Sequence, residues 1–430
     1  MGAGFRGFRM GTMADQSTDT IAVPRLLLFE YSELNPAYRD NPHAFLDPQR
    51  AERPAEHDGM MPIVLVSAYD AGRDTLLDRT LTRDFSDAAK DNPVIASVFK
   101  IGDQVEAEFG PHVSMLTLED PDHGRVRGAI APALLKRAAG MQGRIVEIVD
   151  SLLDELEAKG SFDIVADYAT PVPIRVLGAL LGCPDEALPD LKRWTEAGQS
   201  AFDPTKTPEQ EQAALEGRRG ILGFFRDLIN ERRQTPGDDL VSDLLAAQAA
   251  GSSLSDTELL HNLFGLLTAG HLTTADMIGN GTWLLLTHEG ARRALKADAA
   301  LWPAAVEEIL RYEPPIATTA RFSKTEGAVA GCPYHAGDGL AVSLIAVNRD
   351  PAKFADPHCF DVTRKPNPHM AFGAGSHICI GAPLARIEGQ IALSRLLARF
   401  PDLRPADPSA PPAWRAILGA RGLSQLDVVV

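Results

Sequence analysis

Cysteine is scarce in this sequence. The 430 residues include only four cysteines, Cys183, Cys332, Cys359 and Cys379, and no two of them form a Cys-x-x-Cys pair. Thiols this few and this scattered exclude a disulfide framework and argue against a structural zinc site. Each cysteine therefore has to be explained by its own surroundings.

Long apolar runs and an excess of positive charge are also missing. The longest apolar run near the middle, residues 283–286, falls far short of the ~20 residues that span a bilayer. Lysine and arginine total 42 against 58 aspartate and glutamate residues, a formal net charge of −16. We expect such an acidic protein to bind neither nucleic acid nor an anionic membrane.

The first residues do not resemble a secretion signal. Residues 1–20 contain glycine, arginine, serine and aspartate but no apolar core. We therefore expect a flexible leader over residues 1–20 and a cytoplasmic location.

The remaining sequence is typical of a globular protein with a large core, since 45% of all residues are apolar and 23% are charged. Length alone predicts two or three domains, but no linker, repeat or low-complexity tract divides the chain. We expect one domain over residues 21–430. A strand at Ile63–Val66 precedes a helical region over 121–312, with an apolar stripe over 145–156, and short strands and a helix over 381–398 follow. The fold class is mainly α with a small β portion.

One helix is predicted to cross the whole molecule. Ser255 and Glu258 form a capping box, and the helical pattern continues to about Thr287. At 1.5 Å per residue, roughly 32 residues give a length of ~48 Å. Each glycine inside such a helix lowers stability by up to ~1 kcal/mol relative to alanine, so something must offset that cost. The predicted helix contains four of them, Gly265, Gly270, Gly279 and Gly281.

The segment FGAGSHICIGAPLAR, residues 372–386, is the most informative part of the sequence. Gly373, Gly375 and Gly381 permit a tight turn with positive φ and a close approach of the backbone to a flat partner. Cys379 comes just before a helix N-terminus, where the dipole and free N–H groups favour a thiolate. A single thiolate is sufficient to ligate haem iron, although a buried structural cysteine beside a glycine turn is the ordinary alternative.

This segment resembles the haem-binding loop of the cytochrome P450 family, F-x-x-G-x-[HR]-x-C-x-G followed by L-A-R, and every defining position matches. The resemblance extends over about residues 115–400. It implies the cytochrome P450 fold with a long central helix over the haem, and haem b with Cys379 as the axial thiolate ligand that assists O–O cleavage. It also places Phe372 and Gly381 among the residues that bind the cofactor.

Basic residues at other family positions imply how the two haem propionates are bound. His123 and Arg127 are four residues apart and share one face of a helix. They resemble the propionate-binding histidine and arginine of the family, as do Arg321 and His377. Each of these residues alone would more often be an ordinary surface residue.

Glu308 and Arg311 place opposite charges at positions i and i+3 of a predicted helix. A solvated ion pair is the ordinary interpretation. The family resemblance implies instead a buried structural network that includes Arg364, with a role in folding and not in catalysis.

Residues 269–274, AGHLTT, lie midway along the long helix and resemble the segment that crosses the distal face of the haem. Small side chains at Ala269 and Gly270 would let the helix approach the ring and leave room for dioxygen. The resemblance implies that the Thr273 hydroxyl hydrogen-bonds the bound oxygen and passes protons to it. A threonine that hydrogen-bonds only to its own helix is the alternative.

The sequence departs from the family at Leu272, where an acid normally precedes the threonine. Leucine cannot relay a proton, and His271, which titrates near neutral pH in water, is not an obvious substitute. Three outcomes stay open: water or a substrate hydroxyl carries the proton, another side chain does so, or the enzyme uses peroxide or performs a different oxidation.

The function implied by the resemblance is monooxygenation of a small hydrophobic organic molecule, in secondary metabolism or catabolism. The chain has no room for a fused reductase, so the expected partners are a ferredoxin and an NAD(P)H-dependent ferredoxin reductase, with O2 as co-substrate. A peroxide-driven or coupling enzyme and a non-catalytic haem sensor or carrier are the alternatives. The expected substrate pocket is apolar, and its walls include Val113, Leu266, Ile316, Ala317 and Leu418.

Overall fold

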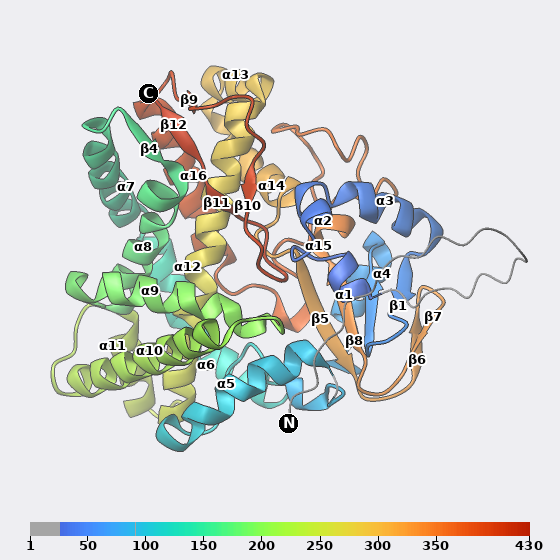
Figure 1. Cartoon of the computed structure of the whole chain (residues 1–430). Helices are drawn as coiled ribbons and strands as arrows, with labels where there is room; N and C mark the ends of the chain where they lie inside the picture. Colours follow the sequence, from blue (N-terminus) through green and yellow to red (C-terminus); the bar gives the residue numbers. More distant parts are fainter. Residues whose placement is uncertain (1–25, 91) are drawn as a thin grey trace, which may run out of the picture.

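A computed structural model describes residues 26–90 and 92–430, so the predicted leader over residues 1–20 lies outside the described part of the chain. Helices dominate, and the strands form small sheets. Figure 1 shows α12 (Asp256–Thr287) passing through the middle of the molecule, with helices on one side and the largest sheet on the other. The predicted fold class, mainly α with a small β portion, is confirmed.

The longer helices form the bulk of the protein. Besides α12 they are α5 (Pro93–Phe109), α6 (Asp122–Gly140), α7 (Gln142–Glu157), α8 (Pro171–Leu181), α9 (Leu188–Gly198), α10 (Pro208–Gln234), α11 (Leu240–Ala249), α13 (Glu289–Ala297), α14 (Trp302–Tyr312) and α16 (Ala382–Arg399). The shorter helices are α1 (Leu27–Glu30), α2 (Pro36–Asp40), α3 (His43–Glu52), α4 (Tyr69–Leu77) and α15 (Leu344–Val347).

The largest sheet has the strand order β1-β2-β8-β5-β3, in which only β2 and β8 are parallel. Its strands are β1 (Ala55–His57), β2 (Ile63–Val66), β3 (Leu81–Thr82), β5 (Thr318–Ser323) and β8 (Gly339–Ser343). The smaller sheets contain β4 (Ser161–Asp163), β12 (Asp427–Val429) and β9 (Arg404–Pro405), the pair β10 (Ala413–Trp414) and β11 (Leu423–Gln425), and the pair β6 (Gly327–Val329) and β7 (Cys332–Tyr334).

The predicted start of the central helix is confirmed. Ser255 is the N-cap of α12, and its hydroxyl accepts from the Glu258 backbone N–H while the Glu258 carboxylate accepts from the Ser255 backbone N–H. These two bonds satisfy donors that a helix N-terminus otherwise leaves unpaired.

Close packing of neighbouring helices explains two of the glycines in α12. A Cβ at position 270 would lie 3.2 Å from Leu177 of α8, and a Cβ at position 281 would lie 3.0 Å from both Ile309 of α14 and Leu393 of α16. The expected reason for Gly270, room for dioxygen, is therefore corrected, because the missing side chain makes room for α8.

The main apolar core lies among the helices, and the predicted stripe over 145–156 of α7 is buried in it. The 18-residue helical stretch Ile164–Leu181 is long and apolar enough to cross a membrane, which the sequence analysis missed. Because 67% of it is buried inside the protein, it belongs to the same core.

A buried ionic network joins α14 to the loop before the cysteine segment. Arg311 donates to both carboxylate oxygens of Glu308 at 2.7 and 2.8 Å, and both side chains are completely buried. The Arg364 Nε donates to Glu308 at 3.2 Å, and the Arg311 guanidinium also donates to the carbonyls of Asn348 and Pro357. The hydrogen bonds that pair the buried charges also fix the position of the loop that precedes residue 372.

Candidate functional site

The cysteine segment forms a tight loop between β8 and α16. The Cys379 backbone N–H donates to the Phe372 carbonyl at 2.9 Å, which closes the loop. Gly373 and Gly375 have φ values of 72° and 78°, and a Cβ at position 375 would lie 2.7 Å from a backbone oxygen. Gly381 has a φ of −81°, so the expectation of positive φ is wrong for this residue, which is the N-cap of α16.

Cys379 is a free cysteine just before α16; the residue is exposed, but the surrounding loop largely desolvates its thiol. Desolvation by burial raises the pKa of this thiol, while the N–H groups of Gly381 and Ala382 and the charges of Arg127 and Arg386 act in the opposite direction. The N–H groups at the helix N-terminus thus favour the thiolate as expected, but burial outweighs them and the net pKa is raised. A bound metal ion would supply the missing stabilisation, since a coordinating thiol is deprotonated outright.

Basic side chains from separate parts of the chain gather beside Cys379. His123 and His377 have ring centroids 4.2 Å apart, and the Arg127 guanidinium donates to the Ile378 carbonyl at 2.8 Å. Burial first, and then the nearby charges of Arg83, His123, Arg321 and Arg127, lower the pKa of His377 to about 3. The structure thus brings together all four residues expected at the propionates.

This cluster has more donors than the protein can satisfy. The buried Nε2 atoms of His123 and His377 have no hydrogen-bond partner, and Arg321, 4% exposed, donates only to backbone carbonyls. Burial and the charge of Arg83 lower the pKa of Arg321 to about 10. Glu119 lies 3.7 Å from the His377 Nε2 and offsets part of the positive charge. Unpaired buried donors of this kind fit a ligand that carries carboxylates, as haem does.

Arg83 was missed by sequence reasoning. It follows β3, its backbone N–H donates to the Glu119 carboxylate, and its charge acts on both His377 and Arg321. No local motif marks it, because β3 is only two residues long.

The side of α12 that carries Ala269 and Thr273 is open. Ala269 is exposed and Thr273 is half-buried although both lie midway along a helix that is otherwise mostly buried. The Thr273 hydroxyl donates to the Ala269 carbonyl at 2.7 Å, which is the ordinary alternative considered for it. Leu272, 8% exposed, offers no proton.

His271 points away from this side of α12. Its Nδ1 lies 2.7 Å from the Thr195 hydroxyl and its Nε2 lies 3.2 Å from the Thr170 carbonyl. Burial lowers the pKa of His271 to about 4, so the ring is neutral near pH 7 and the expectation that it titrates near neutral pH is wrong.

An acid that the sequence analysis did not single out lies one turn beyond Thr273. Asp276 is 6% exposed, and both of its carboxylate oxygens accept from the Arg415 guanidinium. Burial raises the pKa of Asp276 to about 7, although Arg415 acts against this shift. Residues three apart on a helix are neighbours on its surface, so Asp276 is an ionisable group next to the Thr273 turn.

Four of the five predicted pocket residues lie on accessible segments. The Val113 carbonyl accepts from Asn262 of α12 at 3.3 Å, and a bridge between Ile316 and Ala420 holds the Leu418 loop beside residue 316. Leu266 is half-buried on α12. Ala317 is corrected, because it is 1% exposed and packs in an apolar cluster with residues of α1, α2, α3 and α15, so no substrate can touch it.

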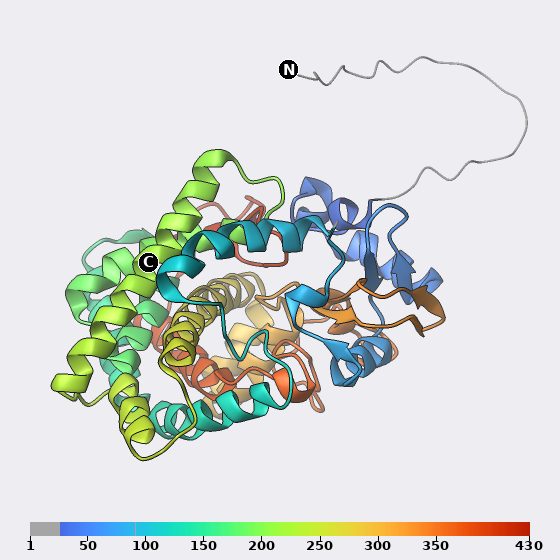
Figure 2. The same ribbon diagram turned by 90° about the horizontal axis from the view of Figure 1, so that it is seen from below.

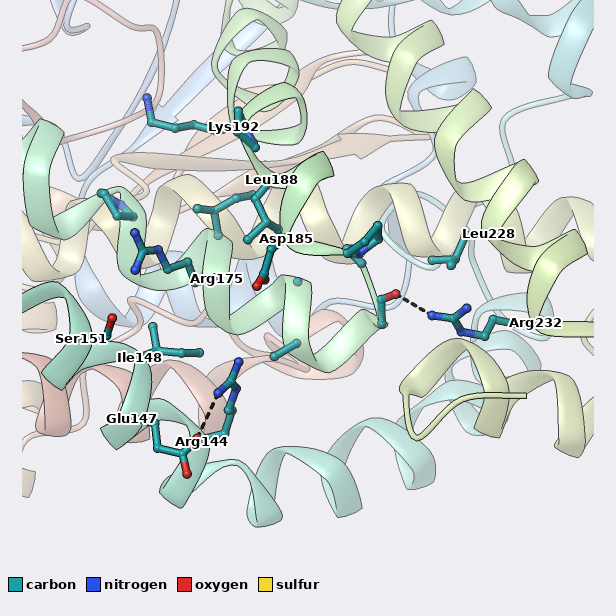
Figure 3. Close-up of a pocket in the computed structure, with 18 of the residues that line it drawn as sticks. Arg144, Glu147, Ile148, Ser151, Arg175, Asp185, Leu188, Lys192, Leu228 and Arg232 are labelled. Carbon is teal, nitrogen blue, oxygen red and sulfur yellow. Dashed lines mark hydrogen bonds and ion pairs between the residues drawn. The ribbon is translucent and has the colours of Figure 1, made fainter. Parts of the chain in front are cut away.

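A separate pocket of about 940 Å³ opens between α7, α8, α9 and α10 (Figure 3). Its charged side chains have partners within the protein: Arg144 donates to Glu147 at 3.0 Å, and Arg232 donates to the Gly182 carbonyl at 2.8 Å. Burial raises the pKa of Cys183, which lines this pocket, to about 12, so its thiol is unreactive. The pocket shares no lining residue with the Cys379 site.

Comparisons with known proteins point in one direction. The family model for cytochrome P450 matches residues 200–412. Cytochrome P450 107B1 of Saccharopolyspora erythraea is 36% identical over 412 residues, 94% of this chain and 98% of the relative. The 6-deoxyerythronolide B hydroxylase of the same organism is 37% identical over 85% of this chain and 89% of the relative. The crystal structure of myxobacterial cytochrome P450 CYP267B1 with myristic acid aligns with a TM-score of 0.84 and 36% identity, covering 92% of this chain and 98% of that one.

Proposed function

Because this chain belongs to the cytochrome P450 family and is a haem-thiolate monooxygenase, we propose that Cys379 is the thiolate that binds the haem iron. The observation that carries this assignment is the set of unpaired basic groups gathered beside that cysteine. Of the other cysteines, Cys183 lines the separate pocket of Figure 3 and Cys332 is in a small hairpin. The arginines beside Cys359, Arg311 and Arg364, are engaged in hydrogen bonds to Glu308 and to the Cys359 carbonyl.

The same proposal assigns the propionates to His123, Arg127, Arg321 and His377, with Arg83 added from the structure. The two unpaired imidazole Nε2 atoms are free to donate to carboxylate oxygens, and the arginines supply charge-assisted hydrogen bonds. Phe372 and Gly381 frame the cysteine loop, through the hydrogen bond that closes it and the N-cap of α16.

When bound, haem supplies the reductive activation of dioxygen, which consumes two electrons and two protons for each oxygen atom inserted. The protein residues must deliver those protons and keep other water away. The Thr273 hydroxyl donates to the Ala269 carbonyl in this structure. We propose that it rotates during the reaction, so that the proton on its Oγ1 points toward the site where oxygen binds. Leu272 is buried and has no proton to donate.

Asp276 is the side chain that we propose to supply Thr273. Burial raises the pKa of its carboxyl to about 7. A group with a pKa near the working pH both donates and accepts protons readily. Arg415, whose side chain is 18% exposed, connects it to the protein surface. This route selects the second of the three outcomes left open by Leu272, in which another side chain takes over the missing acid's role.

We further propose that the enzyme works in the cytoplasm with a ferredoxin and an NAD(P)H-dependent ferredoxin reductase. The substrate is a hydrophobic organic molecule held between the segments that carry Val113, Leu266, Ile316 and Leu418. Two of the similar proteins support this class, since one is a 6-deoxyerythronolide B hydroxylase and one was crystallised with myristic acid.

Optical titration of the purified ferric protein with a library of hydrophobic compounds tests the proposal. We expect a subset to shift the Soret band toward the high-spin form as they displace water from the iron. Those compounds should then incorporate one atom of isotopically labelled dioxygen with ferredoxin, reductase and NADPH. Turnover with peroxide alone, without label from dioxygen, would contradict monooxygenation and support the peroxide-driven alternative.

A further inference from the structure

Three basic side chains meet where the end of α5, helix α10 and the first half of α12 come together. Figure 2 shows α10 (light green) beside α12 (yellow), with α5 (cyan) next to α10. The Arg218 Nη2 lies 3.2 Å from the His112 Nδ1, which in turn lies 3.3 Å from the His261 Nδ1. The His261 Nε2 is 3.3 Å from the Phe109 carbonyl, which fixes the ring.

Arg218 has no acidic partner within the described part of the chain: no carboxylate lies within ion-pair distance of it, and its buried Nε has no hydrogen-bond partner. Burial lowers the pKa of His112 to about 3 and also lowers the pKa of His261, so both rings are neutral near pH 7. Arg218 is then a lone, partly buried cation, and such a charge destabilises the fold unless a ligand brings its partner.

We propose that Arg218, positioned by His112 and His261, binds the carboxylate of an elongated hydrophobic substrate. The guanidinium Nε without a partner is available for a charge-assisted bond to a carboxylate oxygen. An apolar contact lies on one side of the guanidinium, where the Phe264 ring centroid is 5.2 Å from the guanidinium carbon. This inference rests on the proposed function, since it concerns the substrate of the same oxidation.

The position of the cluster links it to the proposed pocket. His112 directly precedes Val113, and His261 directly precedes Asn262, which hydrogen-bonds the Val113 carbonyl. Along α12, His261, Gly265, Ala269 and Thr273 follow one another at intervals of four residues, and each step turns about 40° around the helix, so they trace a slow spiral from the cluster toward Thr273.

This arrangement sets the length of the substrate. Twelve residues of α-helix at 1.5 Å each separate His261 from Thr273 by roughly 18 Å. Leu116, which is 41% exposed and lies 3.5 Å from where a Gly265 Cβ would be, provides apolar surface between these two ends. A substrate whose carboxylate is bound at Arg218 is therefore oxidised far from that carboxylate, toward its other end.

Binding of tetradecanoate and of the uncharged tetradecan-1-ol to the haem-loaded protein tests the proposal. Arg218→Gln should weaken tetradecanoate binding on the order of tenfold or more and leave the alcohol unchanged, because only the acid loses a charge-assisted bond. Arg218→Lys should keep part of the preference for the acid. Arg219→Gln, on the exposed neighbour in the same helix, is the matched control and should bind both probes as the unaltered protein does.

Thermal unfolding gives a second readout that does not depend on turnover. Without ligand, Arg218→Gln should unfold at a higher temperature than the unaltered protein, because it removes an unpaired charge. Tetradecanoate should raise the unfolding temperature of the unaltered protein more than that of the variant.

Equal affinity for acid and alcohol, or unchanged acid binding in Arg218→Gln, would overturn the proposal. If acetate stabilised the protein as much as tetradecanoate does, the cluster would bind small anions only, and the substrate assignment would be wrong. Failure of the proposed function itself would be seen separately, as the absence of a thiolate-type Soret band in the reduced carbon monoxide complex.

Discussion

At the scale of single residues, the chemistry of this site depends on which ionisable groups are left without partners and which are neutralised. The buried Nε2 atoms of His123 and His377 have no hydrogen-bond partner, whereas both ring nitrogens of His271 have polar neighbours and its ring is neutral. Asp276 lies between these cases, buried and paired, with a pKa near 7. The proton route proposed for the reaction follows from this distribution.

Replacing Asp276 by asparagine should uncouple the reaction. The amide keeps the size of the side chain but cannot carry a proton, so we expect several-fold less product per NADPH consumed and more peroxide released. Adding Leu272→Glu to this variant should restore coupling, because it returns an acid to the Thr273 turn. Asp150→Asn, in the ion pair with Arg395 between α7 and α16, is the control. Unaltered coupling in Asp276→Asn would remove Asp276 from the route.

The raised pKa of Asp276 also predicts a pH dependence of stability. Its pKa is higher in the folded protein, about 7, than its ordinary value of 3.8, so protonation favours the folded state. The stabilising contribution is complete at low pH and is lost as the pH rises through about 7. The free energy of unfolding of the unaltered protein, relative to that of Asp276→Asn, should therefore fall between about pH 4 and pH 7 in denaturant titrations. A constant difference would contradict the shifted pKa.

At the scale of elements, α12 is positioned by close packing against neighbouring helices. α8, α14 and α16 approach it closely at Gly270 and Gly281, while the side that carries Ala269 and Thr273 stays open. Close packing of these neighbouring helices therefore holds α12 in place.

Two glycines of α12 should respond oppositely to alanine. Gly281→Ala would place a Cβ 3.0 Å from Ile309 and Leu393, and the overpacking should cost about 1–3 kcal/mol in unfolding free energy. Gly279→Ala meets atoms only at 3.9 Å and should stabilise the helix by up to about 1 kcal/mol. Denaturant unfolding of both variants measures the difference. Equal effects would show that close packing is not the reason for Gly281.

How far the sequence predicts each element depends on how local its signal is. The Ser255 cap and the cysteine loop were found because their patterns lie within a few residues, and the cap lies where expected. Arg415 contacts Asp276 across 139 positions of sequence, so no local pattern marks the pair. Arg83 follows a strand of only two residues, and its contact with Glu119 also has no local pattern. The prediction for Ala317 was wrong because the sequence just before β5 does not show that an apolar cluster covers this residue.

At the scale of the whole molecule, the helical part and the long loop before the cysteine are joined by the Glu308 network. Arg311 is completely buried and donates to Glu308 and to three backbone carbonyls of that loop, including Cys359. The role assigned to Arg364 stays a prediction, but its hydrogen bond to Glu308 places it in the network. The expectation of a single domain over residues 21–430 also stays a prediction.

Breaking this network should destabilise the protein strongly. Arg311→Met leaves the buried Glu308 carboxylate without its main partner, and we expect a loss of about 3–5 kcal/mol together with poor haem retention. Arg293→Met, in an exposed pair with Glu289, should change stability by no more than about 0.5 kcal/mol. Chemical unfolding of both variants is the measurement, and similar losses would contradict a structural role specific to the buried network.

The central claim, that Cys379 is the thiolate ligand, is tested most directly by the absorption spectrum of the reduced carbon monoxide complex. The account predicts the strongly red-shifted Soret band of thiolate-bound haem in the unaltered protein and in Cys359→Ser, whose exposed cysteine lies outside the cysteine loop. Cys379→Ser should lose that band, because a serine hydroxyl does not donate electron density to iron as a thiolate does. A normal band in Cys379→Ser, or its loss in Cys359→Ser, would contradict the account.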